Sequence, residues 1–238
     1  MNIKKPNKFI ELIANILHIY SAKTYKYGSI VYCDYINRVY YVTGELKSEC
    51  PYTNGEKHGI EIGYYKSGQM LYETSYNNDV KDGIEKIHYE NGKLMREIPF
   101  VNGKAHGIYK GYYESGQLQS EWSYNNDKMD GISKGYYASG QLEYETRYEN
   151  GKKHGTQIDY YEISKLKCET SYENGKKHGI SRCYRENGQL WFETIYVNDK
   201  VKDTKHYDEN GELKCETSYK NGELIGIKIS QTLPMTKI

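Results

Sequence analysis

The stretch YYESGQLQSEWSYNNDKMDG, residues 112–131, decides the fold, because its pattern recurs along most of the chain. The glycine that follows its aromatic pair, Gly116, has glycine counterparts at positions 44, 68, 92, 140, 188 and 211, and Ser164 stands in the same place. The step between these anchor positions is 24 residues six times and 23 residues once. We number each repeat from its anchor, so that Leu118 stands at +2.

Three further columns keep this spacing in all eight copies. An apolar residue stands at +2: Leu46, Met70, Leu94, Leu118, Leu142, Leu166, Leu190 and Leu213. Glutamate stands at +5: Glu49, Glu73, Glu97, Glu121, Glu145, Glu169, Glu193 and Glu216. An aromatic residue stands at +8: Tyr52, Tyr76, Phe100, Tyr124, Tyr148, Tyr172, Tyr196 and Tyr219. Columns held in register over eight copies establish a tandem repeat.

Each repeat has the pattern of two antiparallel strands. Side chains alternate along a strand, so positions +2, +4, +6 and +8 are predicted to share one face. That face is mostly apolar and the opposite face carries the glutamates, which is typical of a half-exposed antiparallel strand. A repeat of 24 residues without helical periodicity leaves no room for a parallel β-α unit, because its crossover needs a helix.

The turns agree with this assignment. Asn-Gly pairs, as in Asn102-Gly103, favour tight hairpins because both residues tolerate positive φ, and in three repeats Asp replaces this glycine, as in Asn78-Asp79. A further glycine, such as Gly131, closes most repeats. Short turns pair neighbouring strands, so we expect an all-β repeat protein: an elongated single-layer antiparallel β-meander of about eight two-stranded units.

The repeat resembles the MORN-repeat variant, on the pattern Tyr-Tyr-x-x-Gly-x-Leu-x-x-Glu-x-x-Tyr-x-Asn-Gly-x-x-x-Gly. The resemblance covers roughly residues 38–226 and implies a β-meander that serves as an interaction platform. Members of this family include chains regarded as bacterial antitoxins, and the related classical repeat is linked to membrane-associated scaffolds. Ser164 replaces an anchor glycine and Asp203-Thr204 replaces a closing glycine, so we expect irregular turns there.

The two ends differ from the array. In residues 7–20 a helical stripe of apolar residues predicts a short amphipathic helix, made of Phe9, Leu12, Ile13, Ile16, Leu17 and Tyr20. This helix would either cap the open edge of the sheet or contact a partner or membrane surface. We therefore divide the chain into a capping segment, 1–37, with one or two irregular strands, a repeat array, 38–226, and a C-terminal strand and tail, 227–238.

Composition narrows the class of protein further. The chain has 28 tyrosines but only three Phe and two Trp, and its net charge is +1. This balance gives no support for nucleic-acid binding, which favours a basic stripe. The five cysteines form no pairwise pattern and no CxxC motif, so we expect reduced thiols and a cytoplasmic location. Cys168 and Cys215 share position +4 and are expected to pack as small apolar residues.

No catalytic, cofactor or metal site is predicted. The glutamates recur about 10 Å apart, so a solvated column with Lys or Arg across the strand explains them better than paired catalytic carboxylates do. Four histidines occupy equivalent turns at similar distances, too far apart to share an ion: His58, His106, His154 and His178.

The remaining candidate for function is the surface of the sheet. We expect a non-enzymatic scaffold that binds protein partners, because repeat proteins use extended sheets for such contacts. Tyr and Trp concentrate at interfaces, and the predicted partner-binding residues are Tyr41, Tyr65, Tyr113, Tyr137, Tyr161 and Trp191. The alternatives are an antitoxin-like neutraliser of a partner protein and a peripheral membrane-associated scaffold. The oligomeric state stays open.

Overall fold

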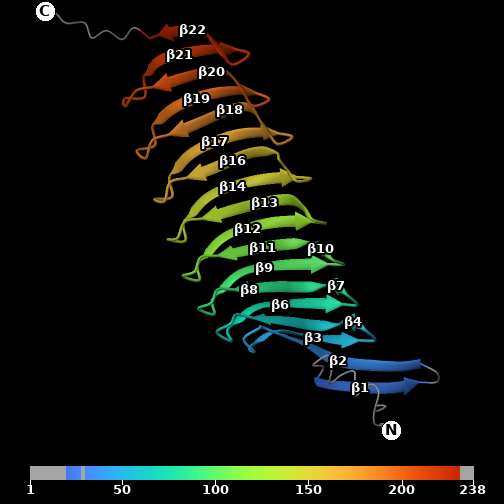
Figure 1. Ribbon diagram of the computed structural model, residues 1–238. Coiled ribbons are helices and arrows are strands. Elements are labelled where there is room, and N and C mark those ends of the chain that lie inside the picture. Colours follow the sequence, from blue (N-terminus) through green and yellow to red (C-terminus); the bar gives the residue numbers. More distant parts are fainter. Residues whose placement is uncertain (1–19, 28–29, 231–238) are drawn as a thin grey trace, which may run out of the picture. The chain divides into compact units, whose positions relative to one another are not determined.

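The computed structural model describes residues 20–27 and 30–230, drawn as coloured ribbon in Figure 1. All regular secondary structure in these residues is β-strand. The chain divides into two compact units, one of residues 1–118 and 124–127 and the other of residues 119–123 and 128–238. Strand β12 (Leu118–Asn125) contributes to both. Within the described residues, no helical segment has the length and apolar character needed to span a bilayer.

The first unit is an antiparallel meander in which consecutive strands pair. Its strands are β1 (Tyr20–Tyr27), β2 (Ile30–Tyr40), β3 (Leu46–Thr53), β4 (Glu56–Lys57), β5 (Gly59–Tyr64), β6 (Met70–Asn77), β7 (Val80–Lys81), β8 (Gly83–His88), β9 (Leu94–Val101), β10 (Lys104–Ala105) and β11 (Gly107–Tyr112).

The second unit repeats the same arrangement. Its strands are β13 (Lys128–Tyr136), β14 (Leu142–Glu149), β15 (Lys152–Lys153), β16 (Gly155–Tyr160), β17 (Leu166–Glu173), β18 (Lys176–Tyr184), β19 (Leu190–Val197), β20 (Lys200–Tyr207), β21 (Leu213–Lys220) and β22 (Glu223–Ile229). The predicted all-β antiparallel meander is confirmed in each unit.

The N-terminal helix stays a prediction, because residues 7–19 lie outside the described part of the chain. Tyr20, placed on its apolar stripe, instead begins strand β1, so the assignment of that residue to the helix was wrong. The following residues form β1 and β2, as the expected one or two strands. At the other end, β22 begins at Glu223, four residues before the predicted C-terminal strand.

The Asn-Gly and Asn-Asp turns join each hairpin to the one before it. In both kinds of turn, both central residues have positive φ, as in Asn198 (51°) and Asp199 (68°). In six of these turns the second residue donates its backbone N–H to a carbonyl just after the preceding turn, as Asp199 does to the Lys177 carbonyl of β18 at 2.9 Å. Where this residue is Asp, its Oδ1 also accepts the N–H of that same residue, 2.8 Å from Lys177 in this case. Asp therefore replaces Gly at the expense of backbone strain but with an added hydrogen bond.

Replacing Asp199 tests this exchange. Asp199→Ala removes the acceptor and leaves a left-handed residue without its local hydrogen bond, so we expect a loss of about 2 kcal/mol in the free energy of unfolding. Asp199→Gly removes the same acceptor but relieves the backbone, so it should cost about 1 kcal/mol less than Ala. Urea unfolding of the two variants measures the difference. An alanine variant as stable as the glycine variant would contradict the strained geometry.

A β-bulge at the anchor end of each repeat changes the predicted faces. In the second repeat the register shifts after Gly63, so that Met70 at +2 lies opposite Tyr64. The column at +2 therefore does not continue the row formed by +4, +6 and +8. We call the face that carries +4, +6 and +8 the threonine face, and the face that carries +5 and +7 the glutamate face.

The most buried side chains of the threonine face are small and mostly polar, which corrects the expectation of an apolar face built on Leu and Tyr. Apart from three glycines, the residues less than a tenth exposed are Cys50, Thr74, Ser120, Ser133, Thr146, Thr170, Ser181, Cys183 and Thr194. In a single layer, only neighbours on the same face cover a side chain. Small residues are buried under the flanking rings, while the larger side chains stay half-exposed.

The closing glycines are required for two reasons, as Gly59 illustrates. Its φ is +107°, and an added Cβ would lie 2.9 Å from Cγ of Pro51 on the paired strand.

The repeat that lacks this glycine has a different backbone at the equivalent place. The spacing between anchors is one residue shorter there. Val201 and Asp203 pair with neighbouring residues of β19, so the one residue between them is inserted into the ladder. The chain passes this point as one continuous strand, β20, without positive φ in residues 201–204, so the expectation of an irregular turn here was wrong.

The expectation of an irregular turn at Ser164 was wrong. Ser164 adopts a positive φ of 60°, where the anchor glycines have φ of 82–102°. Its backbone N–H donates to the Tyr161 carbonyl at 2.8 Å, as the anchor glycines do in the other repeats. The side-chain Oγ also bonds with the amide oxygen of Gln141, so serine keeps the turn at the cost of a strained backbone.

Candidate interaction surface

The predicted binding tyrosines stand at −3, and their hydroxyls join one repeat to the next. Four of them, and Tyr89 at the same position of the third repeat, donate to the backbone carbonyl of the −4 residue in the following repeat. The pairs are Tyr41 to Tyr64 (2.8 Å), Tyr65 to His88 (2.8 Å), Tyr89 to Tyr112 (2.8 Å), Tyr137 to Tyr160 (2.7 Å) and Tyr161 to Tyr184 (2.8 Å). Tyr113 occupies the same position and is half-buried, like the others.

The β-bulge explains why this position needs a donor. At the bulge, residue −4 leaves the regular ladder, and a backbone carbonyl without a partner costs free energy. The tyrosine of the preceding repeat supplies the missing hydrogen bond. In the seventh repeat the residue is Arg185, and its Nη2 donates to the Tyr207 carbonyl at 3.0 Å. Position −3 therefore has a side-chain donor even where arginine replaces tyrosine. This indicates that the tyrosine hydroxyls of the column have a structural role.

Removing one hydroxyl measures this role. Tyr161→Phe should lower the free energy of unfolding by about 1 kcal/mol, because it leaves the Tyr184 carbonyl without its donor. Tyr196→Phe is the matched control, since the Tyr196 hydroxyl makes no hydrogen bond within the described residues and its ring packs under Lys177. Equal stability of the two variants in urea unfolding would mean that the hydroxyl at −3 contributes nothing.

Trp191, the sixth predicted binding residue, is 46% exposed. The Arg185 guanidinium lies over its ring at 5.3 Å, and Phe192 meets it edge-on, also at 5.3 Å. An open depression of about 640 Å³ beside it is lined in part by His206, Asp208, Lys214 and Cys215. Trp191 is thus the most accessible of the six residues.

The glutamate column has the partners that the sequence predicted. Four members form cross-strand ion pairs: Arg38–Glu49 (3.1 Å), Lys86–Glu73 (2.8 Å), Lys134–Glu145 (3.3 Å) and Arg182–Glu193 (2.7 Å). Tyrosines at −4 donate to four: Tyr64 to Glu49, Tyr112 to Glu97, Tyr136 to Glu121 and Tyr184 to Glu169. Burial and the hydrogen bond to Glu169 raise the pKa of Tyr184 to about 12.

Sequence reasoning missed an exposed isoleucine column on this same face. Position −8 pairs with +7 across the hairpin, as Ile60 does with Ser75 and Ile132 with Arg147. The column consists of Ile60 (50% exposed), Ile84 (49%), Ile108 (55%), Ile132 (50%) and Ile180 (39%). The glutamate face is therefore not purely polar. The signal was present in the sequence, as an apolar residue one position after most closing glycines.

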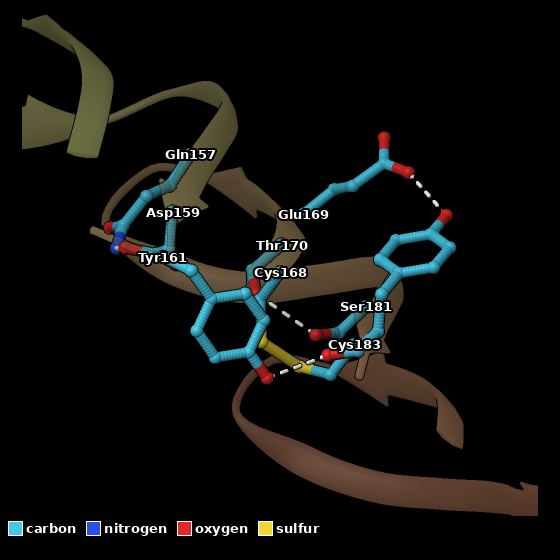
Figure 2. Close-up of a disulfide and its surroundings, with 9 residues drawn as sticks. Gln157, Asp159, Tyr161, Cys168, Glu169, Thr170, Ser181 and Cys183 are labelled. Carbon is cyan, nitrogen blue, oxygen red and sulfur yellow. Dashed lines mark hydrogen bonds between the residues drawn. A yellow bond between two sulfur atoms is a disulfide. The ribbon is translucent and has the colours of Figure 1, made fainter. Parts of the chain in front are cut away.

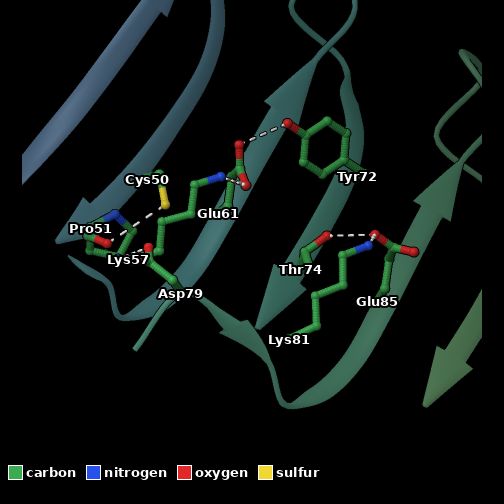
Figure 3. Close-up of polar contacts among 9 residues, drawn as sticks. All are labelled: Cys50, Pro51, Lys57, Glu61, Tyr72, Thr74, Asp79, Lys81 and Glu85. Atoms are coloured by element: carbon green, nitrogen blue, oxygen red, sulfur yellow. Dashed lines mark hydrogen bonds and ion pairs between the residues drawn. The ribbon is translucent and has the colours of Figure 1, made fainter. Parts of the chain in front are cut away.

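The threonine face carries charged pairs of its own in the first unit (Figure 3). Lys57 Nζ lies 2.8 Å from Glu61, and Tyr72 donates to the other oxygen of that carboxylate at 3.1 Å. Burial lowers the pKa of Lys57, but the hydrogen bond and charge of Glu61 outweigh burial and raise it above its ordinary value. Burial, with the charge of Glu61, raises the pKa of the neighbouring Cys50 thiol to about 11, which keeps this thiol protonated.

Cys168 and Cys183 form a disulfide, contrary to the expectation of reduced thiols (Figure 2). Their strands β17 and β18 pair directly at these residues, and the two Cα atoms lie 4.1 Å apart. A residue at +4 faces residue −5 of the next repeat, which the anchor spacing alone did not reveal. Cys168 is therefore not the small apolar residue predicted, whereas Cys215 remains a free thiol.

The turn histidines stand apart from one another, each near a different polar group. His58 lies 3.3 Å from the Asn78 amide oxygen, and His178 lies 3.8 Å from Glu173. Among the described residues, no group of three His, Cys, Asp or Glu side chains is placed to hold a metal ion.

Comparison with known proteins agrees with this geometry. The model of the MORN repeat variant family matches six segments: residues 57–78, 81–102, 105–126, 129–150, 177–198 and 200–221. These segments make up more than half of the chain, which belongs to the MORN repeat variant family. The array is interrupted at the copy that contains Ser164. Repeats of this kind generally mediate interactions with proteins or membranes.

Other comparisons add little. No curated protein matches the sequence. Among solved structures, a porin-like protein from Bacteroides uniformis is similar at 9% sequence identity and a TM-score of 0.22, over 88% of this chain and 94% of that chain. A similarity this low carries no argument about fold or function.

Proposed function

We propose that the chain is a non-enzymatic scaffold that binds a protein partner on its glutamate face, through the isoleucine column. The observation that carries this proposal is the recurrence of one exposed, β-branched apolar residue at position −8 in five repeats. Isolated exposed apolar residues are ordinary, but a regular column of them bordered by ion pairs has the composition of an interaction surface.

The spacing of the column suits an amphipathic helix of the partner. Successive isoleucines are two strands apart, or about 9.6 Å at the usual strand separation. An α-helix advances about 10.5 Å in seven residues, so a helix lying across the strands would bring one apolar residue per heptad onto each isoleucine. Trp191 lies apart from this surface, beside a depression lined in part by His206 and Cys215 of the threonine face.

Repetition supports the non-enzymatic assignment. The glutamates at +5 recur at equivalent positions of the sheet with ion-pair or tyrosine partners, while catalysis needs one place that differs from the rest. The cytoplasmic location also remains a proposal. A cysteine pair in contact forms a disulfide in an oxidising compartment and two thiols in a reducing one, so the pairing of Cys168 with Cys183 fits either.

Replacing three isoleucines tests the docking surface. The triple variant Ile60→Thr, Ile84→Thr and Ile108→Thr should keep its fold, because the sixth repeat carries Thr156 in this column. A partner captured from host lysate with the native chain is purified, and its Kd is measured for both forms. We expect binding to weaken by about tenfold or more, because three apolar contacts are lost.

A matched control removes exposed apolar side chains elsewhere. Val42 and Ile163 lie in anchor turns, outside the isoleucine column, and Val42 is fully exposed while Ile163 is 59% exposed. The double variant Val42→Thr and Ile163→Thr should therefore leave the Kd of the partner unchanged. Equal binding by the native chain and the triple variant would exclude the isoleucine column as the docking surface. Failure of the native chain to retain any protein partner would contradict the scaffold function itself.

A further inference from the structure

The last strand of the second unit, β22 (Glu223–Ile229), is exposed along its whole length. It pairs with β21 on one side, and no described strand pairs with its other side. Four of its seven residues are large and apolar: Leu224 (50% exposed), Ile225 (63%), Ile227 (60%) and Ile229 (71%). The preceding strand β21, which has neighbours on both sides, is mostly half-buried.

Such an edge is a template for another strand. Its outer backbone N–H and C=O groups are unpaired by strands of the described chain, and sheets usually protect edges with several charges, prolines or a covering element. Strand β22 contains no proline and only two charged residues, Glu223 and Lys228. The edge therefore has the backbone groups and the apolar side chains that strand addition requires.

The sequence of β22 is complementary to itself in antiparallel pairing. When two copies pair about the point between Ile225 and Gly226, each Glu223 lies opposite a Lys228. The same register places each Leu224 opposite an Ile227. The two-fold axis produces both contacts twice, so that two opposite-charge pairs and two apolar pairs form together.

The faces of the strand agree with this register because the pairing with β21 skips Ile225, a β-bulge that interrupts the alternation of side chains between the two faces. Within the chain, Leu224 pairs with Tyr219 and Ile227 pairs with Thr217, so both lie on the threonine face. Glu223 pairs with Lys220 and Lys228 pairs with Glu216, so both lie on the glutamate face. A shift of one residue would place Leu224 opposite Lys228, on the wrong faces.

We propose that this chain forms a symmetric dimer in which β22 pairs antiparallel with β22 of a second copy. The contact joins the threonine faces of the two second units through Leu224 and Ile227. Because the edge of one strand is a small interface, the dimer is reversible and depends on concentration. This proposal is independent of the isoleucine column, which lies on other strands.

Sedimentation equilibrium of the full chain over a range of concentrations tests the proposal. The mass should rise from 27.8 kDa towards twice that value. Glu223→Lys alone, and Lys228→Glu alone, place like charges opposite each other twice, so each should raise the dimer dissociation constant about tenfold or more. Lys214→Glu, an exposed reversal on β21, is the matched control and should have no effect.

Mixing the two single variants gives the sharpest result. In a mixed dimer the Glu223→Lys chain faces the Lys228→Glu chain, so both charged contacts again join opposite charges. Association should therefore return, although each variant alone associates weakly. Each reversal also disturbs its own pairing with β21, and mixing cannot repair that. Recovery therefore reports contacts between chains only, and far-UV circular dichroism confirms that both variants are folded.

Several outcomes would overturn the proposal. A native chain that stays at 27.8 kDa at every concentration has no such dimer. Single variants that associate like the native chain would exclude this register, as would a mixture that does not recover. Growth beyond a dimer would indicate a head-to-tail contact between different edges rather than a closed two-fold pairing.

Discussion

Removing the Cys168–Cys183 disulfide is expected to lower the free energy of unfolding of the second unit by about 3 kcal/mol. The two cysteines are 15 residues apart in sequence, and a covalent link closing a loop of this size restricts the unfolded chain by about that amount. The register of β17 and β18 brings the two residues together without the disulfide.

The measurement is urea unfolding of the double variant Cys168→Ser and Cys183→Ser beside the oxidised native chain. Cys215→Ser is the matched control, since that thiol forms no disulfide, and it should change stability much less. The native chain under reductant should approach the double variant. A double variant within about 0.5 kcal/mol of the oxidised chain would mean that the link does not constrain the unfolded state.

The second large effect is expected from Gly63→Ala on the threonine face. The ring of Tyr72 lies over this glycine, and an added Cβ would stand 2.1 Å from the ring carbon Cε1. The ring must move, which also disturbs the hydrogen bond from Tyr72 to Glu61. Overpacking of this kind costs about 1–3 kcal/mol, and we expect the upper half of that range.

A double-mutant cycle isolates this contact. The fourth repeat carries Ser120 at the position of Tyr72 and Gly111 at the position of Gly63, so Tyr72→Ser is compatible with the local backbone. Gly63→Ala combined with Tyr72→Ser should cost at least about 1 kcal/mol less than the sum of the two single variants, because the clash is then absent. Additive effects would show that the ring does not occupy the space above Gly63.

The sequence predicts the repeat, its hairpins and its turn chemistry because each of these depends on local residues. Asn-Gly pairs specify tight turns wherever they occur, and the spacing of Glu49 from Arg38 follows from strand pairing. The family assignment follows from the same columns. Where a feature depends only on periodicity and turn type, prediction and structure agree.

The missed features depend on register between strands. The pairing of Cys168 with Cys183 and the position of the +2 column both follow from bulges, which insert residues that a strict alternation does not count. The −3 tyrosines are predicted as a binding surface because Tyr concentrates at interfaces, while the hydrogen bonds of their hydroxyls to the next repeat depend on how neighbouring repeats pair. Arg185 was the available clue, since it is the residue that keeps a donor where tyrosine is absent.

Neighbouring hairpins are joined by hydrogen bonds from their turns as well as through their strands. Amide hydrogen exchange tests this directly. The backbone N–H groups of Gly151, Gly175 and Asp199 donate to carbonyls just after the preceding turn at 2.7, 2.8 and 2.9 Å, so they should exchange as slowly as strand amides despite lying in turns. The amide of Asn198, which donates to no described group, should exchange quickly. Exchange of all four amides at the rate of an unstructured chain would contradict the account.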